Sequence, residues 1–202
     1  MKKNWFISFC LFPVLVFADA STDLMNALGG LHTMRAHFMQ NIHDSRGRVL
    51  DQSEGDMALQ RPGKFRWEIL QPQSQLVIAN NNIVWIYDKD LEQATKQKQQ
   101  NGNGLSPALL LSAPNEKLLQ NFVITHPSEN QFLLKPKKGA DALFSSLTLV
   151  FKGQELSSMR MEDKLGQLTQ IKFYDIKLNQ TLPSPLFVFT PPRGVDVIDQ
   201  VR

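Results

Sequence analysis

Apolar and polar residues alternate with a period of two over most of this sequence. Met34, Ala36, Phe38 and Ile42 share one parity, while most residues between them are polar. Successive side chains of a β-strand point to opposite faces, so the segment is predicted to be a strand with one apolar face. An amphipathic helix would need a period near 3.6 instead.

The same pattern recurs along the chain, and turn-forming residues such as Arg61-Pro62-Gly63 and Asn80-Asn81-Asn82 separate the runs. Further strands are predicted at 57–61, 65–69, 76–79, 83–87, 122–125, 132–134, 143–151, 158–161, 168–178 and 187–189. So many short strands, about ten or eleven in all, predict a mainly β chain. We expect one antiparallel sheet that curls toward a barrel to limit its exposed edges.

Two short helices interrupt the predicted strands. Residues 22–28 have apolar positions at helical spacing, with Ser21 as the expected N-cap and Gly29-Gly30 as a stop signal. Residues 106–113 are very apolar, with Ser106 as N-cap and Pro107 at the first helical position. Between the sheet halves, a strand-like segment at 91–95 runs into a predicted mobile loop at 96–104. No internal repeat or second domain emerges.

The N-terminus has the features of a secretory signal. Lys2 and Lys3 precede an apolar run from Trp5 to Phe17 that is too short to span a bilayer as a helix. Cleavage is expected after Ala18, with Ala20 as the alternative, which divides the chain into a signal peptide (1–18) and one domain (19–202). An uncleaved anchor is disfavoured because no stop-transfer pattern follows. Cys10 lies inside the apolar run, so lipidation at the cleavage site is not expected.

The charge balance gives no support to nucleic-acid binding. Twenty-two Lys and Arg against nineteen Asp and Glu give +3, and removing Lys2 and Lys3 with the signal leaves +1. No cluster of basic residues stands out, so the sequence offers no electrostatic argument for nucleic-acid binding. Cys10 is the single cysteine, and the mature chain should therefore fold without a disulfide.

Arg61 is the residue that the strand pattern explains least. It shares the parity of Met57 and Leu59, which would aim a guanidinium at the apolar side of the sheet, where an unpaired charge is costly. Either Arg61 lies at a strand end and extends to water, or it reaches inward for acceptors on another element. Helix C-termini offer such acceptors as unpaired carbonyls. Abundant Phe and Met suit an adaptable binding surface, although a well-filled core is the simpler reading.

At these residues the sequence resembles the outer-membrane lipoprotein carrier family LolA. The match centres on Gly55-Asp56-x-x-x-x-Arg61-Pro62-x-x-Phe65-x-Trp67 and continues through Pro72, Trp85-x-Tyr87 and Glu92-Gln93-Ala94-Thr95. It returns at Phe187-x-Phe189-Thr190-Pro191-Pro192-x-Gly194-Val195. The resemblance implies an incomplete, unclosed antiparallel barrel with a lid of short helices over a hydrophobic cavity.

The resemblance also implies a function in the periplasm. Such a carrier accepts lipoproteins from an ATP-driven release complex of the inner membrane and hands them to an outer-membrane receptor, as a monomer and without a cofactor. The family's lid-locking arginine maps onto Arg61. Positions that would face the acyl chains map onto Leu28, Met34, Phe38, Ile42, Phe65, Trp67 and Ile69.

Three other functions have to be compared with lipoprotein transport. An enzyme is disfavoured, because His32, His37, His43 and His126 have no metal-ligand spacing and no nucleophile motif is present. A receptor of similar fold would begin with a lipidated cysteine, which this chain lacks. A general carrier of small hydrophobic or lipid ligands remains open, because sheet and cavity do not by themselves choose the cargo.

Overall fold

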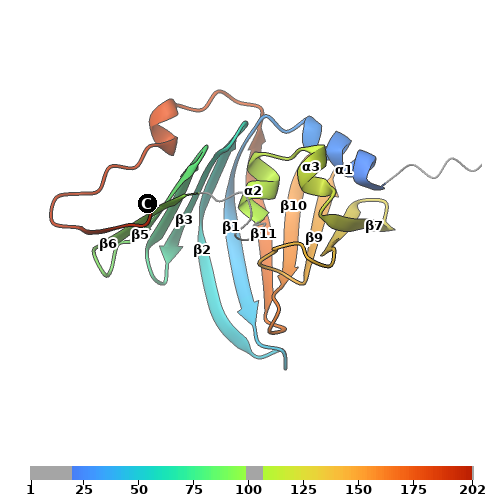
Figure 1. The fold of residues 1–202 in the computed structure, drawn as a ribbon, viewed down its shortest axis with the longest axis horizontal. Helices are drawn as coiled ribbons and strands as arrows, with labels where there is room; N and C mark the ends of the chain where they lie inside the picture. Colours follow the sequence, from blue (N-terminus) through green and yellow to red (C-terminus); the bar gives the residue numbers. More distant parts are fainter. Residues whose placement is uncertain (1–19, 99–106, 202) are drawn as a thin grey trace, which may run out of the picture.

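A single sheet of twelve strands forms most of the molecule (Figure 1). The computed structural model describes residues 20–98 and 107–201, so the predicted signal peptide and its cleavage site lie outside the described residues. The strands are β1 (Thr33–His43), β2 (Val49–Gln60), β3 (Lys64–Gln71), β4 (Gln75–Asn80), β5 (Ile83–Asp88), β6 (Gln93–Lys98), β7 (Phe122–Ser128), β8 (Gln131–Pro136), β9 (Ser146–Lys152), β10 (Glu155–Glu162), β11 (Leu168–Leu178) and β12 (Asp196–Asp199).

The sheet is strongly curved and does not close. Its strand order is β12-β6-β5-β4-β3-β2-β1-β11-β10-β9-β8-β7, and every neighbouring pair is antiparallel except β12 and β6. The end strands β12 and β7 have no pairing with each other in the described part of the chain. This confirms the predicted unclosed, mainly β fold, with slightly more strands than the alternation indicated.

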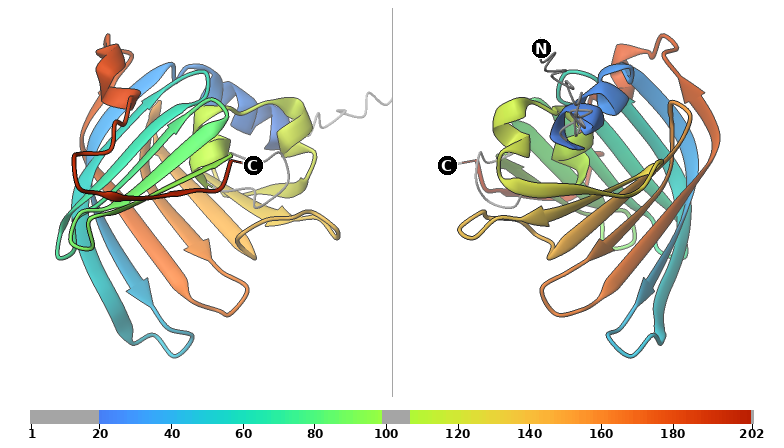
Figure 2. Two further views of the ribbon diagram at one scale, coloured as in Figure 1. Left: turned by 60° about the vertical axis from the view of Figure 1, so that its left-hand side comes forward. Right: turned by 90° about the vertical axis from the view of Figure 1, so that its right-hand side faces the viewer.

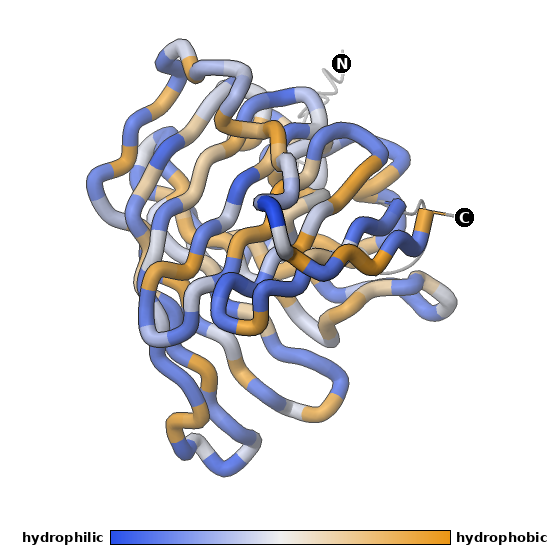
Figure 3. Tube along the Cα trace, turned by 90° about the vertical axis from the view of Figure 1, so that its left-hand side faces the viewer, coloured by the Kyte–Doolittle hydropathy of each residue, from blue (hydrophilic) through white to orange (hydrophobic). Residues whose placement is uncertain are grey.

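Alternation decides which face of each strand is inside. In β1, Met34, Ala36 and Phe38 are buried while Arg35 and His37 are exposed. The register carries this choice to β2, where Gly55 lies opposite Phe38 and Met57 opposite Ala36. Hydrophobic and hydrophilic residues alternate along many of the strands in Figure 3. A shift of one residue would move every apolar side chain to the wrong face, which is why the pattern fixes the register.

Three helices lie together on the concave side of the sheet, toward one of its ends (Figure 2). They are α1 (Ala20–Gly29), α2 (Pro107–Ser112) and α3 (Glu116–Leu119). Leu24 and Leu28 of α1 and Leu110 and Leu111 of α2 are buried in one core with the inner face of the sheet. No helix among the described residues has both the length and the apolar character needed to cross a membrane.

Some predicted boundaries were wrong. Ser21 is not the N-cap of α1, because Ala20 is already helical; the proposed cap Ser106 lies outside the described residues. The short helix α3 was not predicted, since four residues are too few to show a helical period. Lys96 belongs to β6 rather than to a loop, because its backbone pairs with β5 on one side and with β12 on the other.

The C-terminal segment forms a strap over the convex face of the sheet (Figures 1 and 2). A strand was predicted at 187–189, and this was wrong: Ser184–Phe187 form a 3-10 helix, η1. Phe187 is buried there with Ala58, Leu182 and Leu186 in a small second core, and the Asn80 side-chain amide donates to the Phe187 carbonyl at 3.3 Å. Local burial, not alternation, therefore set the conformation of this segment.

Replacing Phe187 with alanine should cost about 3 kcal/mol of unfolding free energy, because it empties the centre of this small core. Phe187 is 1% exposed, whereas its neighbour Val188 is 59% exposed. Urea unfolding followed by circular dichroism would measure the change, with Val188→Ala as the matched control. A Phe187 variant as stable as the control would contradict the packing role of the strap.

Candidate functional site: a lidded apolar cavity

An apolar cavity of about 210 Å³ lies between helix α2 and the inner face of the sheet. Strands from both halves of the curved sheet contribute to it. Helices α1 and α2 are here called the lid helices. The lining residues are Gln40, Phe65, Trp67, Val77, Pro107, Ala108, Leu111, Leu147, Met159, Met161, Thr169 and Ile171. Two methionines give the wall side chains that can adapt to ligands of irregular shape.

The predicted acyl-facing residues differ in where the structure places them: in the cavity wall, in the core beside it, or at partly buried positions. Phe65 and Trp67 line the cavity. Leu28, Met34 and Phe38 are fully packed in the core beside it, with at most 1% of their surface exposed. Ile69 is partly buried against the same core, and Ile42 is half-buried further along β1.

Aromatic stacking joins the core to the cavity wall. The Phe38 and Trp67 rings stack with centroids 3.6 Å apart, and the Phe65 ring lies nearly parallel to Trp67 at 6.1 Å. Phe173 of β11 meets Trp67 edge-on at 6.4 Å. Trp67 therefore touches both the packed core and the open space, which makes it a natural reporter of anything that enters.

Arg61 joins the sheet to two lid helices. It follows the last residue of β2, and its Nε donates to the carbonyl of Leu111 in α2 at 2.8 Å. Its Nη1 donates to the carbonyl of Leu28 in α1. Both acceptors lie in the last turn of their helices, where carbonyls have no intrahelical partner. The structure thus takes the inward of the two orientations that the sequence left open.

Each of the two helices is held by one further bond near its C-terminus. The backbone N–H of Gly63 donates to the carbonyl of Ser112 in α2 at 2.9 Å. The side-chain amide of Asn179 donates to the carbonyl of Gly30, the residue after α1, at 2.9 Å, and Asp23 of α1 lies 3.5 Å from His126 of β7. Loss of the arginine side chain would therefore loosen both helices without releasing either.

Burial makes Arg61 a costly cation. Desolvation lowers the pKa of the guanidinium to about 10, so the group is still charged at neutral pH. Arg61 Nη2 and the buried hydroxyl of Ser112 have no hydrogen-bond partner among the described residues. A buried charge that is only partly bonded offsets much of the energy that closes the lid.

Sequence reasoning missed several cavity residues. Thr169, Ile171, Met159 and Met161 come from β10 and β11, and their side of the barrel meets Trp67 only through the curvature of the sheet. Gln40 shares the parity of Phe38, so the alternation of β1 held a signal for it. A polar residue on an apolar face is easily read as a break in the pattern.

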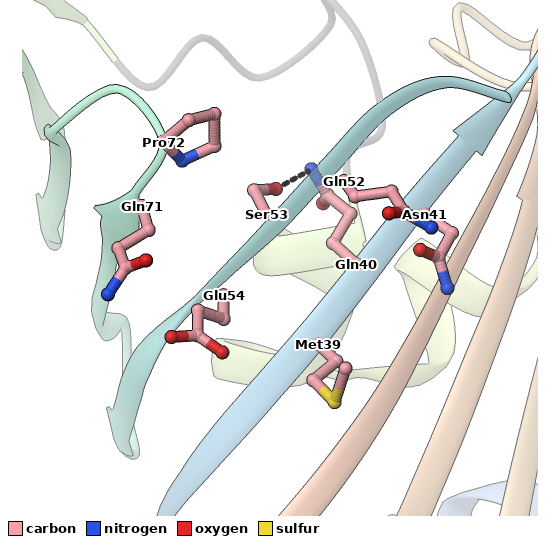
Figure 4. Close-up of a pocket in the computed structure, with 8 residues that line it drawn as sticks. All are labelled: Met39, Gln40, Asn41, Gln52, Ser53, Glu54, Gln71 and Pro72. Atoms are coloured by element: carbon pink, nitrogen blue, oxygen red, sulfur yellow. Dashed lines mark hydrogen bonds between the residues drawn. The ribbon is translucent and has the colours of Figure 1, made fainter.

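A second pocket, of about 310 Å³, adjoins Gln40, and most of the residues that line it are polar (Figure 4). It lies where β2 continues past the end of β3. The Gln40 Nε2 donates to the Ser53 Oγ at 3.2 Å on its wall. In the described residues, no three His, Cys, Asp or Glu side chains gather where they could hold a metal ion.

The family model of the outer membrane lipoprotein carrier protein LolA matches residues 29–190. The chain belongs to this family. An outer-membrane lipoprotein carrier protein of Legionella pneumophila is 39% identical over 204 residues, covering 99% of this chain and 100% of the relative. One from Pseudomonas paraeruginosa is 41% identical over 192 residues, covering 92% of both chains.

Solved structures agree on the fold. A LolA superfamily protein from Nitrosomonas europaea has a TM-score of 0.52 at 12% identity and covers 85% of this chain and 98% of its own. A DUF1329 family protein from Desulfovibrio piger has a TM-score of 0.54 at 11% identity, with coverage of 84% and 95%. At such identities the likeness concerns the fold alone.

Membership in the LolA family confirms the resemblance and sets the function. The protein is an outer-membrane lipoprotein carrier of the periplasm, a chaperone without enzymatic activity whose cargo is lipoprotein. In this carrier, the cavity provides an apolar space, and Arg61 bonds both lid helices.

Proposed function

We propose that this carrier takes up lipoproteins released from the inner membrane by an ATP-driven complex, shields their acyl chains in the cavity, and delivers them to an outer-membrane receptor. The proposal rests on the apolar cavity and on the one arginine that bonds both lid helices. Residues 1–18 would direct export. Amino-terminal sequencing of the exported chain should begin at Asp19, or at Ser21 for the alternative cleavage.

Burial energy explains why a carrier is needed. Each buried methylene contributes about 0.8 kcal/mol, so one sixteen-carbon chain carries roughly 12 kcal/mol of transfer free energy. Cargo with several such chains will not leave a bilayer or cross water unaided. Energy enters at the donor membrane, and the carrier then has to hold the chains less tightly than the acceptor does.

The lid has to open for this cargo. A cavity of about 210 Å³ is smaller than the roughly 300–1,000 Å³ of pockets that enclose a drug-sized ligand. Displacing α1 and α2 would join the cavity to the space they fill with leucines, including Leu28 and Leu111. Arg61 is the proposed lid lock, because the same guanidinium bonds both helices.

The acyl-binding surface in the open state would comprise the cavity wall at Phe65 and Trp67 and the residues that the helices now cover. Met34, Phe38, Ile42 and Ile69 are the proposed strand residues of this second group, and Leu28 is its member on α1. The full burial of Leu28, Met34 and Phe38 in the closed state supports the idea, since the lid would substitute for acyl chains when no cargo is bound.

Filling the cavity should block uptake. Ile171→Trp places a bulky ring in the space, and we expect binding of a lipoprotein's acyl chains to fall at least tenfold, while the sheet stays folded. The control is Lys172→Trp, because the next residue of β11 points to the opposite, exposed face. Fluorescence titration with an acylated peptide measures both. Equal binding by the two variants would place the acyl site elsewhere.

The decisive experiment is mass spectrometry of material that co-purifies with the periplasmic protein. Acylated polypeptides are expected. Free fatty acids or other small lipids as the sole bound material would instead favour a general carrier of hydrophobic ligands.

A further inference from the structure

The apolar cavity and the second pocket, here called the polar pocket after most of its lining residues, share one residue. Gln40 lines both: Trp67 and Ile171 are among the other residues of the apolar cavity, and Ser53, Gln52 and Gln71 are among those of the second pocket (Figure 4). The two spaces are therefore neighbours. An amphiphile whose apolar chains fill the first would have its polar end in the second.

The polar pocket lies at a gap in strand pairing. Strand β3 ends at Gln71, which pairs with Glu54, whereas β2 runs on to Val49. From Val49 to Ser53, β2 pairs with β1 and with no other strand in the described ranges. This gap is here called the β2–β3 notch. Side chains from both faces border it: Gln40 follows the parity of buried Phe38, while Met39 is exposed.

Polar groups at the notch are placed where an apolar face would be expected. Ser53 is 8% exposed, and its partner Gln40 sits on the same face as the core. Burying polar groups costs free energy unless they are hydrogen-bonded. The bond between them uses one of the two Nε2 hydrogens of Gln40, and the Ser53 hydroxyl carries its own hydrogen. The pair can thus present donors to a carbonyl oxygen.

A lipoprotein carries carbonyl groups at the junction between its apolar chains and its polypeptide. Its acyl chains are joined to the polypeptide through ester or amide carbonyls, which are acceptors only. We propose that Gln40 and Ser53 bind these linking carbonyls and that the cargo's polypeptide leaves the carrier through the β2–β3 notch. This deepens the proposed function and rests on it.

A pair of synthetic probes tests the carbonyl contact. A diacylated cysteinyl peptide has ester carbonyls, and its dialkyl ether analogue has the same chains without them. Trp67 emission reports binding, in a Trp85→Phe background that removes the other described tryptophan. Wild-type protein should bind the ester probe about tenfold more tightly than the ether probe, in keeping with one or two net hydrogen bonds.

The variants locate the effect. In Gln40→Leu, and more weakly in Ser53→Ala, the preference for the ester should shrink toward unity while the ether probe still binds. Gln170→Leu is the control, because it makes the same change on β11 at a position paired with Asn41, on the other parity. Equal binding of both probes by the wild type would overturn this inference alone. Binding of neither would overturn the proposed function as well.

Cross-linking tests the exit path. The mature chain is expected to lack cysteine, so a single Gln52→Cys carrying a photoreactive group marks the notch, and Lys138→Cys marks an exposed loop after β8. The cargo's first residues should cross-link at Gln52 at least tenfold more than at Lys138. Equal yields, or an excess at Lys138, would show that the polypeptide leaves by another route.

Discussion

Replacing Arg61 with leucine is expected to leave export and folding intact but to trap cargo on the carrier. Handover to an acceptor should slow by at least tenfold, while loading is retained. Pulse-labelled lipoprotein in a purified carrier–acceptor mixture measures the transfer, and thermal unfolding measures the fold. Transfer at the wild-type rate would remove the argument that the lid governs release.

The expected trapping follows from the energy of closing the lid. Hydrogen bonds from a charged donor contribute about 1.5–3 kcal/mol each, and Arg61 makes two to the helices. The closed lid and the cargo compete for the same space. A lid whose closing releases less free energy therefore displaces the cargo more slowly. The fold should tolerate the change, because it also removes a partly bonded buried cation.

Two arginine variants act as controls. Arg61→Lys keeps the charge without the fork that reaches two carbonyls, so an intermediate rate is expected. Arg66→Leu removes an arginine of β3 that bonds Glu68 and the strap at Leu186, away from the lid. Hydrogen exchange should become faster in the last turns of both α1 and α2 for Arg61→Leu, since each helix loses one bond to the sheet.

Replacing Gly55 with alanine is expected to be the most damaging single-methyl change in the sheet. A Cβ at this position would lie 1.9 Å from the backbone oxygen of Glu68 and 2.8 Å from Cζ of Phe38. Backbone of β3 cannot withdraw without breaking its pairing with β2, and Phe38 is stacked on Trp67. We expect a loss of about 3 kcal/mol or more in unfolding free energy, measured by urea denaturation.

The matched control is Gly29→Ala at the end of α1, where an added Cβ meets nothing within 4 Å. It should leave stability unchanged or slightly raised, because alanine favours helix. If Gly55→Ala unfolded at the same urea concentration as Gly29→Ala, the close approach of β3 to β2 would be wrong.

The alternation of β1 is the part of the fold that could be predicted with least ambiguity. A strict period of two fixes faces and register together, and the inner face of β1 is where it was expected. The strap was not predictable in this way. Phe187 and Phe189 alternate as residues of a strand do. The burial of Phe187 against Ala58 of β2, however, depends on contacts between residues distant in sequence.

The candidate site likewise has features that the sequence pattern indicated and features that it did not. The parity of Arg61 with Met57 and Leu59 left two orientations open, outward to water or inward to acceptors, and helix C-termini were the acceptors named for the second. Their identity as Leu28 and Leu111 needed the coordinates. The cavity wall at Thr169 and Ile171 could not be foreseen, because which distant strands face Trp67 depends on the curvature of the whole sheet.

By itself, the sequence determined most of the strands and their inner faces, α1 and α2 in outline, and the family to which the carrier belongs. These depend on local periodicity and on motifs of fixed spacing. Only the tertiary structure decided the size of the cavity, the two carbonyls that Arg61 bonds and the polar notch beside Gln40. Each of these arises where segments far apart in the chain meet, and local pattern carries no information about such distances.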